Sequence, residues 1–141
     1  MKILILCTGN SCRSQMAHGF LKSFDNRIEV ASAGTEPSGK INQKAVEVMK
    51  DLGIDISHHT SDPVDMYLDD VWDYVITVCD DANEVCPVFT GKVKQRLHTG
   101  FEDPSYATGT EDFIHSEYLR VRDEIREAFC KLYSEEIKSK L

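Results

Sequence analysis

The stretch Cys7-Thr8-Gly9-Asn10-Ser11-Cys12-Arg13-Ser14 places a cysteine, five further residues and an arginine between two regular patterns. The run before it, residues 2–6, is continuously apolar and β-forming, which predicts a buried strand. From Arg13 to about Ser23 the apolar residues recur at helical spacing. The stretch is therefore expected to be a turn that connects a strand to the N-terminus of a helix.

Such a turn is suited to bind an oxyanion, because it directs backbone N–H groups toward the ligand at a helix N-terminus. Gly9 permits a positive φ and Asn10 tolerates one. Arg13 offers a planar fork that matches two oxygens of a tetrahedral anion. The candidate oxyanion-binding residues are Thr8, Gly9, Asn10, Ser11, Cys12, Arg13 and Ser14.

The same positive field favours a thiolate at Cys7, to which the Ser14 hydroxyl is placed to donate. A free cysteine has a pKa of ~8.5 and is only a few per cent thiolate at neutral pH. A pKa lower by about two units, roughly 2.7 kcal/mol, would make it mostly thiolate. Many cysteines are inert core residues, but the spacing of Cys7 and Arg13 at this turn indicates a nucleophile. Cys12 is expected to pack beneath the loop.

The rest of the chain alternates strands and helices, which predicts an α/β fold with a four-stranded parallel sheet and helices on both faces. One domain spanning residues 1–141 accommodates this pattern. Ligands of such sheets bind at the carboxyl ends of the strands, where Cys7 and Cys79 both lie. The further predicted elements are strands at 28–33, 74–78 and 94–97, a helix capped by Asn42 and ended by Gly53, and a long helix from about 111 to 138.

Composition restricts the partners of this chain. Its 141 residues carry a net charge of −8, which disfavours nucleic acid. No stretch approaches the ~20 apolar residues of a membrane span, and the apolar run at the N-terminus is shorter than the ~7–15 residues of a signal h-region. We expect a cytoplasmic monomer whose five cysteines stay reduced unless a redox cycle uses them.

A candidate general acid follows the fourth predicted strand, at Asp103-Pro104. An anion attacked by a thiolate must lose an oxygen, and a carboxylic acid can protonate that leaving group. Asp-Pro alone is typical of a turn, but together with the cysteine loop it favours Asp103 as the acid. Glu102 is the second candidate.

Cys79 and Cys86 form a second feature, at the end of the third predicted strand. Their spacing does not match a zinc site, which leaves an inert buried pair or a redox pair. Seven residues apart on a helix, two cysteines are separated by about 10 Å, whereas a disulfide needs Cα atoms within about 7 Å. If residues 80–86 are helical when reduced, oxidation must unwind them. We therefore expect this segment to move.

Taken together, these motifs closely resemble the thioredoxin-coupled arsenate reductases, which share the low-molecular-weight tyrosine phosphatase fold. The resemblance spans nearly the whole chain, and the pair Cys79 and Cys86 separates reductase from phosphatase. The matching stretches are Cys7 to Ala17, Ser32 to Gly34, His59 to Asp62, Val78 to Pro87, Asp103-Pro104 and Arg120 to Ile125.

The resemblance implies a mechanism that needs no bound cofactor. Arsenate docks on the loop amides and Arg13, and Cys7 attacks arsenic while Asp103 protonates the departing hydroxyl. Cys79 then attacks Cys7, which releases arsenite and leaves a transient Cys7–Cys79 disulfide. Cys86 attacks Cys79 in turn, and thioredoxin reduces the final Cys79–Cys86 disulfide.

Some members of that family bind potassium through positions matching Asn10, Ser32 and Asp62, together with a glutamate. This chain has His18 where the glutamate is expected. An imidazole is a poor partner for a hard cation, so we expect at most a weak potassium site and a bracing role for Asn10. Cys130, on the terminal helix, is expected to be a core residue.

Two alternatives remain open. A low-molecular-weight phosphatase would use the same Cys7, Arg13 and Asp103, with water resolving a phosphocysteine. Such phosphatases usually carry aromatic residues directly after Asp-Pro, whereas Ser105 precedes Tyr106 in this chain. A non-catalytic oxyanion-binding module would bind arsenate without turnover, and the presence of every chemical group argues against it.

Overall fold

The centre of the protein is a parallel sheet of four strands in the order β2-β1-β3-β4. The computed structural model describes residues 1–141, with the side chain of Asn83 left out. The strands are β1 (Lys2–Cys7), β2 (Glu29–Gly34), β3 (Trp72–Thr77) and β4 (Val93–His98). The predicted α/β fold and four-stranded parallel sheet are confirmed, with strand ends shifted by one or two residues.

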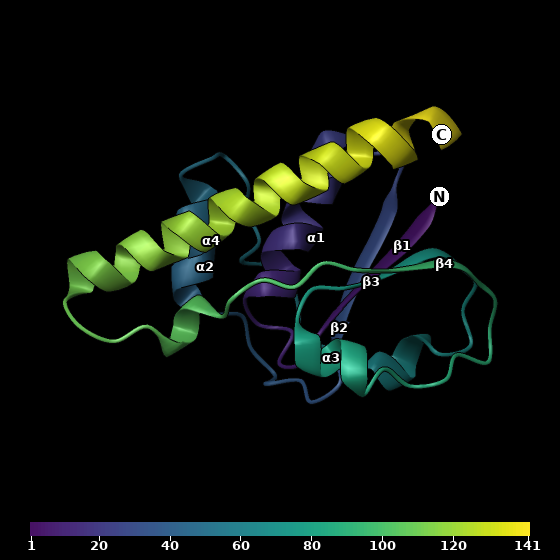
Figure 1. Ribbon diagram of the computed structural model, residues 1–141, viewed down its shortest axis with the longest axis horizontal. Helices are drawn as coiled ribbons and strands as arrows, with labels where there is room; N and C mark the ends of the chain where they lie inside the picture. Colours follow the sequence, from purple (N-terminus) through teal and green to yellow (C-terminus); the bar gives the residue numbers. More distant parts are fainter.

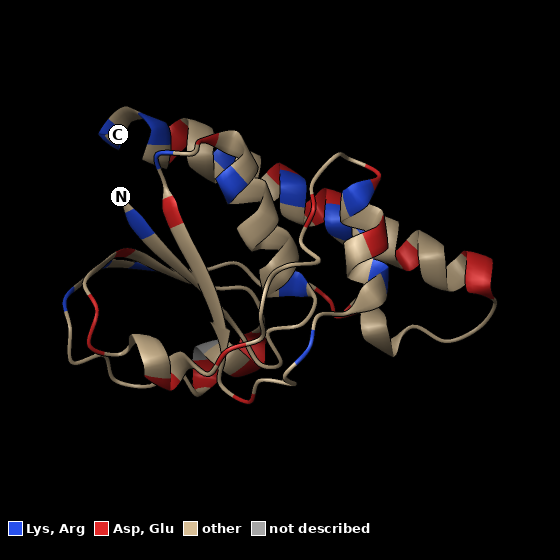
Figure 2. Ribbon diagram, turned by 180° about the vertical axis from the view of Figure 1, so that it is seen from behind, with Lys and Arg blue, Asp and Glu red and all other residues tan. Residues whose placement is uncertain are grey.

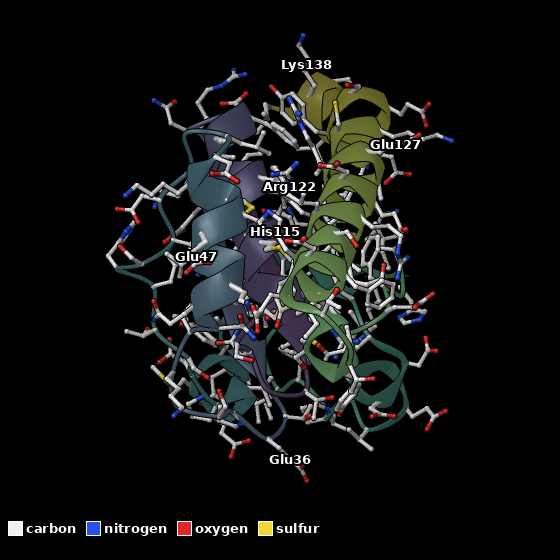
Figure 3. All side chains as sticks on the ribbon, turned by 90° about the vertical axis from the view of Figure 1, so that its left-hand side faces the viewer. Glu36, Glu47, His115, Arg122, Glu127 and Lys138 are labelled. Carbon is white, nitrogen blue, oxygen red and sulfur yellow. The ribbon has the colours of Figure 1, made fainter. Side chains whose placement is uncertain are left out.

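Three helices lie on one side of the sheet (Figure 1): α1 (Arg13–Phe24), α4 (Glu111–Leu132) and the short α2 (Gln43–Lys50), which packs against α1 and α4. Their apolar sides share one core with β1 and β3. Arg122 lies between α4 and α2 (Figure 3), where its Nη1 donates to the Val48 carbonyl at 3.0 Å.

The other face is covered by the short 3-10 helix η1 (Val64–Tyr67) and by the chain that leads into β4. A smaller core lies there, built around Leu4, Leu6, Trp72 and Phe89. Continuous burial on both faces explains why β1 reads as an unbroken apolar run rather than an alternating one.

The helix ends follow local chemistry. The Asn42 side chain caps α2 by accepting from the Lys44 and Ala45 amides, as predicted. Gly53 adopts a φ of +77° in the turn after this helix. α4 is followed by a π-helical turn (Tyr133–Ile137) and a 3-10 turn (Lys138–Lys140), so helical chain extends beyond the predicted end.

One core assignment was wrong. Cys130 is exposed, whereas its neighbour Phe129 is fully buried. Consecutive residues of a helix point about 100° apart, and the buried stripe of α4 continues from Ile125 to Phe129. Cys130 therefore falls outside it.

The carboxyl edge of the sheet gathers the chemical groups. Leu6 pairs with Thr77, so Cys7 at the end of β1 and Cys79 just beyond β3 meet at this edge. The short helix α3 (Asp80–Glu84) lies there too, and Figure 2 shows acidic residues around it. Within the described residues, no helix combines the length and apolar character needed to cross a bilayer.

Candidate active site

Asn10 braces the loop between β1 and α1. It is fully buried and adopts a φ of +49°. Its Nδ2 donates to Ser14 Oγ at 2.9 Å, and its Oδ1 accepts from the Asp62 amide at 2.9 Å. The positive φ falls on Asn10 rather than on Gly9, because an asparagine side chain can compensate this conformation with local hydrogen bonds. The expected bracing role of Asn10 is thus seen directly.

Gln15 and Gly34 constrain the shape of the loop. Gln15 Nε2 donates to the Asn10 carbonyl at 3.0 Å, and to the Thr60 carbonyl at 3.0 Å. Gly34 lies so close that a Cβ there would stand 2.4 Å from the Thr8 carbonyl oxygen. The loop is therefore held in one shape before any ligand binds.

The N-terminus of α1 faces the loop with free donors. Its N-cap residue Cys12 makes no side-chain cap, and its first turn holds no acidic residue. The first N–H groups of a helix have no partner within it and attract anions. They adjoin a cavity of about 570 Å³ lined by Cys7 to Arg13, Cys79 to Asp81, Phe101 to Asp103, and Tyr106.

Arg13 and Asp103 are held together beside this cavity. Arg13 Nη1 donates to the Phe101 carbonyl at 3.0 Å, and Nη2 lies 3.4 Å from Asp103 Oδ2. Asp103 Oδ1 also accepts from the Ser105 amide at 2.9 Å and from the Ser105 hydroxyl at 2.7 Å. Glu102 instead pairs with Arg120 at 3.2 Å, which favours Asp103 as the acid.

The thiols of Cys7 and Cys79 are in hydrogen-bond contact, and both residues are nearly inaccessible, at 3% and 2% exposed. The hydrogen bond to Cys79 and burial raise the pKa of Cys7 despite the nearby Arg13. The pKa of Cys79 is lowered to about 5, because its sulfur accepts from Cys7, the Thr8 hydroxyl and the Ala82 amide. Because each thiol shifts the pKa of the other, Cys7 and Cys79 titrate as a coupled pair, and the thiolate predicted for Cys7 is shared with Cys79.

Cys12 and Ser14 lie beneath the loop. Burial raises the pKa of Cys12 to about 12, so this cysteine stays protonated at neutral pH, in line with a structural role. Ser14 is fully buried and accepts from Asn10, which leaves its own proton free to donate.

Cys86 is half-buried and belongs to a different part of the molecule from Cys79. It packs against the small core on the face of η1, whereas Cys79 belongs to the large core beneath the long helices. The helix α3 covers only Asp80–Glu84, so Cys86 lies beyond its end, and both thiols are free. The segment expected to be helical over residues 80–86 is therefore helical only over its first 5 residues.

The residues at the expected potassium position do not fit that ion. Ser32 Oγ lies 2.9 Å from His18 Nδ1, and the His18 ring stacks on His59 with centroids 4.2 Å apart. Asn10 Oδ1 already accepts from the Asp62 amide. An imidazole pair thus stands where oxygen ligands would be needed.

Several groups at the site could not be found from sequence motifs. The Phe101 carbonyl orients Arg13, and Asp80, Asp81 and Tyr106 line the cavity. A backbone carbonyl leaves no trace in a sequence. The acidic residues after Cys79 were visible, but only the fold brings them to the cavity.

These features define the class of protein. Residues 2–141 match the family described as low molecular weight phosphotyrosine protein phosphatase, and the chain belongs to this family. Within it, the chain is similar to arsenate reductases. It is 49% identical over 124 residues to the arsenate reductase of Halalkalibacterium halodurans, covering 87% of this chain and 88% of the relative. It is 46% identical over 132 residues to arsenate reductase 2 of Staphylococcus saprophyticus, covering 93% and 95%.

Solved structures agree with this placement. An arsenate reductase in a phosphate-binding state superposes with a TM-score of 0.78 at 32% identity, covering 94% of this chain and 96% of that chain. A tyrosine phosphatase from Erwinia amylovora has the same TM-score at 19% identity, covering 94% and 91%, and shares the fold.

Proposed function

We propose that this protein reduces arsenate to arsenite through Cys7, Cys79 and Cys86, and that thioredoxin regenerates it. The observation that carries the proposal is the contact between Cys7 and Cys79 at the rim of an oxyanion loop. A phosphatase needs only the first thiol, whereas a reductase needs a second thiol within reach of it. The names of the relatives support the same reaction.

The first step is attack on arsenic. Arsenate docks on the N–H groups of the loop and on Arg13, where the helix N-terminus favours negative charge. The proton of Cys7 passes along the hydrogen bond to Cys79 and leaves Cys7 as a thiolate. Its sulfur forms a bond to arsenic, and Asp103 protonates the departing hydroxide, which leaves as water.

The second step transfers two electrons. Cys79 gives its proton to an oxygen of the bound arsenic group and attacks the sulfur of Cys7 as a thiolate. A sulfur–sulfur bond forms, the sulfur–arsenic bond breaks, and its electron pair stays on arsenic, which leaves as arsenite. The Thr8 hydroxyl, 3.4 Å from Cys79 Sγ, stabilises the attacking thiolate.

The third step moves the disulfide to the surface. Cys86 attacks Cys79, Cys7 leaves as a thiolate, and the new Cys79–Cys86 disulfide carries the oxidising equivalents. This exchange is neutral in electrons and protons. Cys86 is the more accessible of the three thiols, so its disulfide is the one that an external dithiol such as thioredoxin can reach. No bound cofactor enters any step.

Phosphomonoester hydrolysis is the second candidate. Arg13, Asp103 and the loop suit phosphate as well as arsenate, and the exposed Tyr106 at the cavity rim can contact an aromatic leaving group. We propose this as a weak side activity of the same site.

A single turnover without reductant tests the relay. Fully reduced Cys86→Ser protein mixed with arsenate is expected to yield one arsenite per chain and a Cys7–Cys79 disulfide, identified by peptide mass spectrometry. The matched control, Cys130→Ser, is expected to yield a Cys79–Cys86 disulfide instead. Arsenite release without loss of thiols would contradict the proposal.

A further inference from the structure

Strand β4 contacts both ends of the segment that separates Cys79 from Cys86. At one end, His98 Nε2 lies 2.9 Å from Asp80 Oδ1, at the first residue of α3. At the other end, Arg96 Nη1 donates to Cys86 Sγ at 3.8 Å. The mechanism above gives neither Arg96 nor His98 a role.

The two β4 residues act from the same side of the sheet. Side chains two positions apart on a strand point in the same direction. Arg96 and His98 indeed line one cavity of about 230 Å³ together with Cys86. A single face of β4 therefore contacts both ends of the segment.

Each of the two side chains is itself anchored. His98 Nδ1 lies 2.7 Å from Thr77 Oγ1, its neighbour on β3. The Arg96 guanidinium stacks over the Phe89 ring at 5.3 Å. Because these supports belong to the sheet and its core, the contacts to Asp80 and Cys86 hold the segment against a fixed frame.

The contacts keep two reactive sulfurs apart. Cys86 packs against the core on one face of the sheet and Cys79 belongs to the core on the other. A disulfide joins the two sulfurs directly, so Cys86 Sγ must move away from Arg96 toward Cys79.

We propose that Arg96 and His98 are positioning residues that hold residues 80–86 in the reduced arrangement, so that the Cys79–Cys86 disulfide forms only when both contacts are released. This inference rests on the proposed relay. The exchange that they gate is the attack of Cys86 on Cys79, in which one sulfur–sulfur bond forms, the Cys7–Cys79 bond breaks, and Cys7 takes up the proton that Cys86 lost.

The contacts stabilise the dithiol and are lost in the disulfide, so their removal shifts the thiol–disulfide equilibrium toward the disulfide. One hydrogen bond at such a position contributes enough for a change of about threefold to tenfold. Tenfold corresponds to about 30 mV in the reduction potential of a two-electron couple.

The experiment equilibrates the full chain in dithiothreitol redox buffers, quenches with acid, alkylates the free thiols and quantifies the Cys79–Cys86 disulfide by peptide mass spectrometry. Arg96→Ala and His98→Ala are each expected to raise the equilibrium constant for the disulfide about threefold to tenfold. Arg96→Lys and His98→Gln, which retain a donor, are expected to recover part of the difference. Gln95→Ala, on the opposite side of the same strand, serves as the matched control.

Hydrogen exchange of the reduced variants provides a second readout, and residues 80–86 are expected to exchange faster in Arg96→Ala and His98→Ala than in Gln95→Ala. Equilibrium constants and exchange rates equal to those of Gln95→Ala would overturn the inference and leave the relay standing. A wild-type chain that forms no Cys79–Cys86 disulfide in any buffer would instead overturn the proposed function.

Discussion

The thiol of Cys7 hydrogen-bonds to that of Cys79 at the carboxyl edge of the sheet, where β1 and β3 are neighbours. The parallel register brings together two cysteines that are far apart in the sequence. Because the thiols share a hydrogen bond, loss of one proton gives a thiolate held by its partner. The same contact places the second thiol within reach of the first after the first has reacted.

The substitution Cys79→Ser is expected to separate reduction from hydrolysis. Without this sulfur the Cys7–arsenic adduct cannot be resolved as a disulfide, so arsenate turnover falls to background. Hydrolysis of p-nitrophenyl phosphate, which needs Cys7, Arg13 and Asp103, is expected to persist. Steady-state assays of both reactions test this, with the exposed Cys130→Ser as control. Equal loss of both activities would indicate damage to the loop instead.

Asp103→Asn is expected to lower kcat for arsenate by about 10²- to 10⁴-fold, because an amide cannot protonate the leaving oxygen. The asparagine preserves the shape of the turn that residue 103 caps, because its amide oxygen can still accept from the Ser105 amide. Glu102→Gln, whose carboxylate pairs with Arg120, is the control and is expected to change kcat little. If Glu102→Gln lost more activity than Asp103→Asn, the general acid would be Glu102.

Strands β1 and β3 could be predicted because each carries a continuous apolar run. Residues 2–6 and 74–78 are buried on both faces. Such a run can be identified as a strand from the sequence without knowing which elements pack against it. The 3-10 helix η1 could not be predicted, because a single turn is too short to show a repeating pattern of apolar residues. Phe129 and Cys130 show how far the helical pattern can be trusted. An error of one residue in the position of the buried stripe assigns a surface residue to the core.

The loop could be predicted from the types and spacing of Cys7 and Arg13. The protonation states of the thiols at the loop could not be predicted, because the pKa of Cys79 depends on donors from β1, from the loop and from α3. Nor does the weak pattern of β4 indicate that Arg96 and His98 contact the two ends of the redox segment. These contacts depend on tertiary structure alone.

Oxidation is expected to unfold α3. Hydrogen exchange of residues 80–86 should be at least about tenfold faster in the Cys79–Cys86 disulfide form than in the dithiol form, because Cys86 must leave its place against the small core to reach Cys79. Mass spectrometry on protein of defined redox state measures this. Protection that is the same in both states would show that the segment does not move.

The stacked histidines are expected to make stability fall in mild acid. Burial, together with the neighbouring His59, Lys22 and His58, lowers the pKa of His18 to about 3, against 6.5 for the free side chain. The unfolded chain therefore binds a proton that the folded chain does not, and stability is complete above about pH 6.5 and is lost below it.

Denaturant unfolding at pH 7 and pH 5 tests this expectation. The wild type should lose about 1–2 kcal/mol more than His18→Gln, which cannot titrate. His59, whose pKa is lowered to about 4 mainly by burial, remains in both proteins and cancels in the comparison. An identical pH dependence of the two proteins would show that His18 titrates normally.

Potassium is expected to give no specific stabilisation. Ser32 Oγ and Asn10 Oδ1 are engaged with His18 and with the Asp62 amide, and an imidazole replaces an oxygen ligand. Thermal unfolding in matched concentrations of potassium and sodium chloride should give the same Tm. A higher Tm in potassium chloride than in sodium chloride would show that the two histidines move aside and that potassium binds.

Thioredoxin-coupled arsenate reduction can be measured by following NADPH consumption with arsenate, thioredoxin and thioredoxin reductase, with and without this protein. We expect oxidation of NADPH that requires both arsenate and the protein, and that is lost with Cys79→Ser. No oxidation with fully reduced, folded protein would contradict thioredoxin-coupled arsenate reduction.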